Sequence, residues 1–129
     1  MARRTSPTFT EVELEFMQVI WTLGEVSTEI MQNALHDQGR DLSDGSIRKI
    51  LSILLRKGHL TRRRVGRNFL YKANVHKNQA HRNMVQDLLK RAFDGSVSLM
   101  AAALLDSRDL RDDDIEEIKR LIAEREKKE

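Results

Sequence analysis

The hydrophobic period of the chain changes between residues 43 and 73, and this change limits the folds that the chain can adopt. Over residues 43–58 apolar side chains recur at the three- and four-residue spacing of one buried helix face. They are Ile47, Ile50, Leu51, Leu54 and Leu55. From His59 to Ala73 the pattern becomes roughly alternating around a turn at residues 65–67, which predicts a β-hairpin with Phe69 and Tyr71 on one side.

Two further helices are expected before this unit. Thr10 begins the first, in a capping box with Glu13, and Gly24 ends it. Ser27 begins the second, which runs to about residue 36 with an inner face of Ile30, Ala34 and Leu35. Three helices followed by a hairpin is the order of a winged helix-turn-helix, so we assign residues 1–75 to a winged-helix DNA-binding domain.

Positive charge gathers in the same part of the chain. The formal net charge is only +3, yet the 25 residues from Arg48 to Lys72 contain nine Lys or Arg and no acid. Like charges that face one another across a hairpin repel, and a polyanion would relieve that repulsion. A merely solvated basic surface is the simpler alternative, and the small and cationic residues on the outer face of the helix argue against it.

The two halves of this basic segment suggest different contacts with double-stranded DNA. The outer face of the third helix is expected to touch base edges through Ser46, Arg48, Lys49 and Ser52. The end of that helix and the hairpin, as the wing, are expected to touch the DNA backbone through Arg56, Arg62, Arg63, Arg64 and Arg67.

The remaining residues, 76–129, predict three helices, over about 77–93, 97–105 and from residue 112 onward. They are too apolar to bury their side chains alone, so this region is expected to form a homodimer. The residues expected at the dimer interface are Leu88, Phe93, Met100, Leu104, Ile115, Ile118 and Ile122. A monomeric helical cap on the winged domain is the alternative.

Several classes of function are disfavoured. The chain has no cysteine, and its four histidines are scattered, so we expect no metal site and no cofactor. It shows no nucleophile, glycine-rich phosphate loop or opposed carboxylate pair, so we expect no enzyme. The first ten residues lack the apolar core of a secretory signal, and no apolar stretch is long enough for a membrane span, so a cytoplasmic protein is expected.

Four stretches of the sequence resemble one family of regulators. They are residues 13–21 (Glu-Leu-Glu-Phe-Met-Gln-Val-Ile-Trp), residues 43–58, Gly66-Arg67 before Tyr71, and residues 93–96 (Phe-Asp-Gly-Ser). With these, the chain resembles the penicillinase repressor (BlaI/MecI/CopY) family. The resemblance implies a dimeric repressor that binds a dyad-symmetric operator through its N-terminal domains and dimerises through its C-terminal helices. It also raises the question of a sensor or protease that inactivates the repressor.

The chain departs from the family pattern at three places. Ala103-Leu104 occupies the position of the Asn-Phe pair that is cleaved in the β-lactamase-type members, and the C-terminal cysteine cluster of the copper-responsive members is absent. Asp44-Gly45 stands where relatives often have Pro-Lys, which affects the expected operator sequence more than the binding mode.

Two functions follow as expectations. The first is a homodimeric, sequence-specific transcriptional repressor that occludes a promoter. The second is a winged-helix protein-interaction module whose basic patch only steers association with a partner protein.

Overall fold

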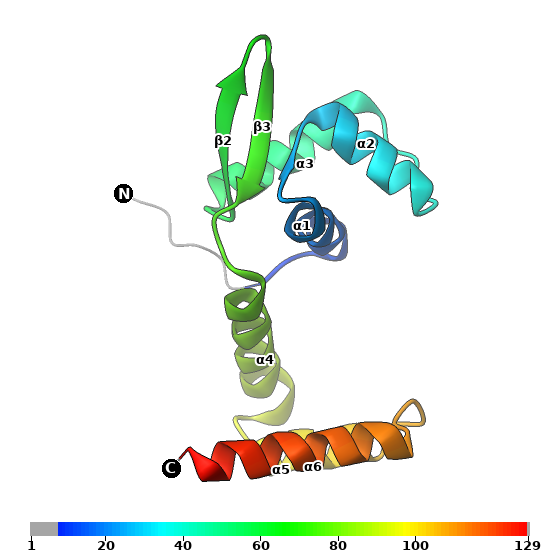
Figure 1. Ribbon diagram of the computed structural model, residues 1–129, viewed down its shortest axis with the longest axis vertical. Coiled ribbons are helices and arrows are strands. Elements are labelled where there is room, and N and C mark those ends of the chain that lie inside the picture. The colour runs from blue at the N-terminus through cyan, green and yellow to red at the C-terminus, as the bar shows by residue number, and fades with distance from the viewer. Residues whose placement is uncertain (1–7, 129) are drawn as a thin grey trace. The chain divides into compact units, whose positions relative to one another are not determined.

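A computed structural model describes residues 8–128 of the chain. Residues 1–7, at the start of the predicted domain 1–75, and residue 129, at the end of the predicted domain 76–129, lie outside the described residues. Most of the first ten residues, in which no secretory signal is expected, therefore also lie outside them. The elements are α1 (Glu11–Leu23), β1 (Glu25–Val26), α2 (Thr28–Asp37), α3 (Asp44–Arg56), β2 (Leu60–Val65), β3 (Asn68–Ala73), α4 (Lys77–Phe93), α5 (Val97–Leu105) and α6 (Asp112–Lys127) (Figure 1). The mainly helical fold with a small hairpin is confirmed.

Side-chain caps begin four of these helices where the sequence predicts them. The Thr10 hydroxyl accepts a hydrogen bond from the Glu13 amide at 3.2 Å, and the Thr10 amide donates to Glu13 Oε1 at 2.8 Å. Ser27, Ser43 and Ser96 each accept, at 3.1 Å, a bond from the amide three residues ahead. Because these bonds satisfy amides that a helix start leaves unpaired, the boundaries of α1, α2, α3 and α5 are set locally.

The sheet has three antiparallel strands in the order β1-β3-β2. β2 and β3 form the predicted hairpin, in which Gly66 takes a positive φ of 63° at the turn. β1 was not predicted, since it is only two residues long and shows no alternation. It pairs Glu25 with Lys72 and Val26 with Tyr71 on the free side of β3.

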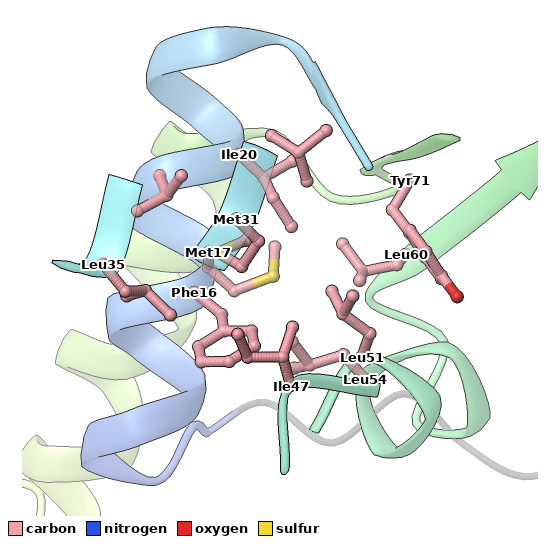
Figure 2. Packing of buried hydrophobic residues seen from close by; sticks show 12 residues of the cluster. Phe16, Met17, Ile20, Met31, Leu35, Ile47, Leu51, Leu54, Leu60 and Tyr71 are labelled. Carbon is pink, nitrogen blue, oxygen red and sulfur yellow. The ribbon is translucent and has the colours of Figure 1, made fainter. Parts of the chain in front are cut away.

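The hydrophobic core lies where α1, α2, α3 and the sheet meet. Figure 2 shows its side chains pointing toward a shared centre, and each is at most 5% exposed. They are Phe16, Met17 and Ile20 from α1, Met31 and Leu35 from α2, Ile47, Leu51 and Leu54 from α3, and Leu60 and Tyr71 from the hairpin.

One predicted core position is wrong. Ile30, assigned to the inner face of the second helix, is 42% exposed. Leu35 is buried as predicted, and Met31, four residues earlier, is buried in place of Ile30. The face that α2 buries is thus set by its packing against α1 and α3, which a ten-residue amphipathic segment does not specify by itself.

The chain divides into two compact units, with the boundary between Asp87 and Leu88 inside α4. The first unit includes the start of α4, where Ala80 is buried. Just before α4, the Val75 carbonyl accepts a 3.0 Å hydrogen bond from the Trp21 indole. In the second unit no side chain from residue 88 to residue 128 is buried. Within residues 8–128, no helix is both long enough and apolar enough to cross a bilayer.

The core packing predicts that shortening different side chains of α3 lowers the free energy of unfolding by different amounts. Leu51→Ala removes a fully buried side chain and is expected to lower the free energy of unfolding by roughly 2–5 kcal/mol. Leu55→Ala, at a half-buried position of the same helix, should cost clearly less. Urea unfolding followed by the fluorescence of Trp21 measures both, and equal losses would contradict this description of the core.

Candidate nucleic-acid interface

The outer face of α3 is polar and exposed. Lys49, Ser52 and Arg56 recur at helical spacing opposite the buried Ile47 and Leu51, and all three are exposed. Among the described residues, neither Lys49 nor Arg56 has an acidic partner within ion-pair distance. The structure therefore leaves two unneutralised cations and a hydroxyl on the surface of one helix.

The start of this helix is more constrained. The Ser43 hydroxyl accepts the Ser46 amide hydrogen bond and donates to the Ser46 hydroxyl at 3.0 Å. Arg48 Nε donates to Asp44 Oδ2 at 2.7 Å, and this hydrogen bond raises the pKa of Arg48 further above its usual value. Both Ser46 and Arg48 are exposed, but each is already held by a neighbour one turn earlier. The bond to Asp44 uses Nε, so the two terminal amino groups of Arg48 remain available to another acceptor.

The hairpin places two of its arginines on the side that faces the core. The strand register sets Arg62 opposite Tyr71 and Arg64 opposite Phe69, so these four side chains share one face. The Arg62 guanidinium lies 4.0 Å from the centre of the Phe69 ring. Arg64 Nε donates to the Gly66 carbonyl at 3.1 Å, across the turn. In Figure 1 this hairpin extends well beyond α3, which contacts its first strand.

Arg63 points to the opposite face of the hairpin. It donates to both carboxylate oxygens of Glu25 in β1, at 2.9 and 3.3 Å. These bonds lower the pKa of Glu25, with Lys72 contributing through its charge. The four wing arginines are therefore not equivalent, because Arg62 and Arg64 share the core-facing side while Arg63 already has an anionic partner.

Lys57 has a structural role. Its ammonium group donates to both carboxylate oxygens of Glu13, at 2.9 and 2.8 Å. Glu13 is buried, and burial raises its pKa, but the hydrogen bonds from Lys57 and Thr10 outweigh this effect and hold the pKa below its ordinary value of 4.5. One of the nine cations of the basic segment thus joins the end of α3 to the start of α1.

A groove of about 480 Å³ lies between α2, the start of α3 and the hairpin tip. Arg48 and Arg67 both line it, which brings together two cations that are 19 residues apart in the sequence. Glu29 and Asp44 line it as well, so the groove presents charges of both signs. Sequence patterns did not reveal its amide-bearing residues, since isolated amides give no periodic signal: Gln32, Asn33 and Asn68.

The histidines do not group with other ligands. Within residues 8–128 no three His, Asp or Glu side chains are placed to hold a metal ion together. His36 forms a hydrogen bond with Asp41 at the surface, which raises its pKa, and His59 is buried.

Comparisons with known proteins extend over nearly the whole chain. The family model described as penicillinase repressor matches residues 9–124. A relative from Latilactobacillus sakei, named "Uncharacterized 16.5 kDa protein in ptsI 3'region", is 31% identical over 122 residues, which are 95% of this chain and 82% of the relative. The penicillinase repressor of Bacillus licheniformis is 26% identical over 92% of this chain and 91% of its own length.

A solved structure of a repressor domain is similar to the N-terminal part. The solution structure of the DNA binding domain of the repressor BlaI is 29% identical in sequence, with a TM-score of 0.52. The match covers 59% of this chain and 92% of that domain. The winged-helix fold expected for the N-terminal part of the chain is thereby confirmed.

Removing Lys57 tests its assignment as a structural cation. Lys57→Met leaves a buried carboxylate without its cation, and because Lys57 is about one third exposed we expect a loss of roughly 2–3 kcal/mol near pH 7, less than for a fully buried pair. The native pKa of Glu13 is depressed, so the stability from this pair is present above the ordinary pKa and is lost as the pH falls through the native value.

Urea unfolding at neutral and at acidic pH measures this difference. The loss of unfolding free energy caused by Lys57→Met should be smaller at acidic pH than at neutral pH. Adding Glu13→Gln to this variant should restore part of the lost stability at neutral pH. A variant as stable as the parent at pH 7 would argue against the pair.

Proposed function

The chain belongs to the penicillinase repressor family, and from this premise we propose that it is a homodimeric, sequence-specific DNA-binding repressor that occludes a promoter by binding a dyad-symmetric operator. Residues 1–75 would bind the DNA and residues 76–129 would form the dimer. The family is one of transcriptional repressors rather than enzymes. A protein that acts on an operator works in the cytoplasm, and that location is part of the proposal.

The outer face of α3 is the observation that supports this proposal most directly. Lys49, Ser52 and Arg56 are exposed on it, and the two cations have no acidic partner in the described part of the chain. A helix of this kind fits the major groove, where cations and hydroxyls can read base edges. We propose that Ser46, Arg48, Lys49 and Ser52 make these base contacts.

The proposed phosphate contacts come from the end of α3 and from the wing, through Arg56, Arg62, Arg63, Arg64 and Arg67. Arg67 has no ion-pair partner among residues 8–128 and is the clearest candidate. Arg63 would have to share its guanidinium between Glu25 and a phosphate. Phosphate contacts fix the position of a protein on the duplex, whereas base contacts give sequence preference.

Exposed apolar side chains in the second unit support the proposal of a dimer. In the single chain Leu88, Leu104 and Ile122 are between 47 and 56% exposed. Large apolar side chains left exposed in one unit commonly mark an interface. We propose that these residues, together with Phe93, Met100, Ile115 and Ile118, meet a second copy of the chain.

An inactivating partner, either a sensor or a protease, remains part of the proposal. Ala103-Leu104 lies inside α5 and is exposed, although it differs from the Asn-Phe pair cleaved in the β-lactamase-type members. Cleavage at this position would require a protease with a different side-chain preference.

Base and phosphate contacts predict different responses to substitution. Selection from a random duplex pool first supplies the preferred sequence. Arg67→Ala should then lower affinity for all sequences alike and reduce the slope of log affinity against log salt by about one. Lys49→Ala should relax preference at particular base pairs, by roughly 1–3 kcal/mol.

Lys72→Ala is the matched control, because Lys72 lies on the hairpin face that carries Glu25. If Arg67→Ala and Lys49→Ala act alike on every sequence, the division of roles is wrong. If the parent protein selects no sequence and shows no salt dependence, the interaction-module alternative gains support instead.

The dimer proposal has its own test. Leu104→Asp would place an unpaired charge in the apolar interface, at a cost of several kcal/mol. Sedimentation should then show monomers, and affinity for the full palindrome should collapse while weak half-site binding survives. Ser98→Asp, on the same helix, is the control for the added charge alone, and an unchanged dimer in Leu104→Asp would remove this residue from the interface.

A further inference from the structure

His59, at the base of the hairpin, is a buried titratable group that the proposed DNA contacts do not use. It is 2% exposed, and within residues 8–128 neither Nδ1 nor Nε2 has a hydrogen-bond partner. Its ring instead contacts Phe9, with the ring centres 4.3 Å apart. A buried polar group without partners costs stability even when neutral, and far more when it is charged.

The charged groups that face this ring are already hydrogen-bonded to each other. They are Glu13 of α1 and Lys57 at the end of α3. Both Glu13 oxygens already accept from Lys57, and Oε1 also accepts from the Thr10 amide. Burial lowers the pKa of His59, the Glu13 charge opposes this and Lys57 reinforces it, so the pKa lies below the ordinary 6.5.

The backbone of His59 joins three segments of the winged domain. Its amide donates to the Leu54 carbonyl in α3 at 3.0 Å, and its carbonyl accepts from the Asn74 amide, just after β3, at 2.8 Å. The residue therefore lies where the recognition helix ends, where the wing begins and where the chain leaves the wing.

Aromatic contacts extend from this ring toward α4. Phe9 meets Trp21 edge to face at 6.3 Å, and Trp21 meets His81 of α4 in the same manner at 6.2 Å. Trp21 also holds the Val75 carbonyl through its indole hydrogen bond. Movement of the His59 ring would thus disturb the packing that holds the end of the wing against α1.

We propose that His59 is a pH-sensitive switch of the winged domain: in mild acid its ring takes up a proton, leaves its site beside Phe9, and loosens the base of the wing. An imidazolium needs acceptors for two N–H groups, and among the described residues neither ring nitrogen has one, so the protonated ring is better accommodated in water. Loss of DNA affinity in acid would follow, and that consequence alone rests on the proposed function.

The direction of the pH effect follows from linkage. The unfolded chain binds a proton at His59 near the ordinary pKa of 6.5, whereas the folded chain resists it. The folded state is therefore favoured above that pH and loses stability as the pH falls below it. If the ring stays neutral in the folded state, the folding equilibrium constant falls about tenfold between about pH 7.5 and about pH 5.5.

His59→Leu tests the switch, because leucine fills the site without titrating. Urea unfolding of the full chain, followed by the fluorescence of Trp21, the single tryptophan, measures the folding equilibrium constant at both pH values. We expect the ratio of the parent's constant to the variant's constant to fall about tenfold on acidification. The remaining histidines are present in both proteins and cancel in this ratio.

His81→Asn is the control for the fluorescence itself. The His81 ring contacts Trp21, so this variant should alter the native fluorescence signal and leave the pH dependence of folding unchanged. If His81→Asn abolishes the tenfold effect, or if the parent and His59→Leu respond to acid equally, the proposal is overturned.

Nuclear magnetic resonance of the parent decides the matter if His59→Leu does not fold. The His59 ring signal should remain that of a neutral imidazole until the domain opens, and titration near pH 6.5 without loss of native structure would overturn the switch. Binding to a random duplex pool at both pH values is measured last. A folded parent that never binds DNA would refute the proposed function and leave the unfolding result for His59 standing.

Discussion

Burial of one stripe of α3 determines what the winged domain presents to solvent. Ile47, Leu51 and Leu54 are fully buried against α1, α2 and the sheet. The helical period then forces Lys49 and Arg56 outward. Turning the helix by one residue would bury a cation and expose leucine, so the hydrophobic effect, rather than any charge interaction, fixes the direction of the basic face.

Acids that precede the basic stretch in the sequence reduce the basic surface that remains. The stretch from Arg48 to Lys72 contains no acid, yet Glu13 pairs with Lys57, Glu25 with Arg63 and Asp44 with Arg48 in space. Two of these acids precede their partners by 44 and 38 residues. The surface that carries unpaired positive charge is therefore smaller than the sequence suggests. It comprises the outer face of α3, the core-facing side of the wing and the tip of the wing.

The order and limits of the longer elements could be predicted from the sequence because their signals are local. Thr10, Ser27 and Ser43 mark helix starts within four residues, and the hairpin shows a change of period. Long-range features could not be predicted in this way. β1 forms only because β3 lies beside it, and Ile30 is exposed because α1 and α3 select a different face of α2.

The candidate interface shows the same division between local and long-range information. The outward placement of Lys49 and Ser52 follows from helical spacing alone. The opposite sides taken by Arg62 and Arg63 follow from strand alternation, but the pairing of Arg63 with Glu25 depends on the third strand. The burial of His59 is invisible in the sequence, since a histidine after a glycine at a strand start is ordinarily read as a surface residue.

The strand order has a consequence for how the protein behaves in solution. Because β3 lies between the other two strands, β2 forms an open edge of the sheet. Open edges can add strands from other molecules and so start aggregation. Three consecutive arginines, residues 62–64, lie along this edge, and two such edges repel each other. The positive charge of the wing thus disfavours pairing between the edge strands of two molecules.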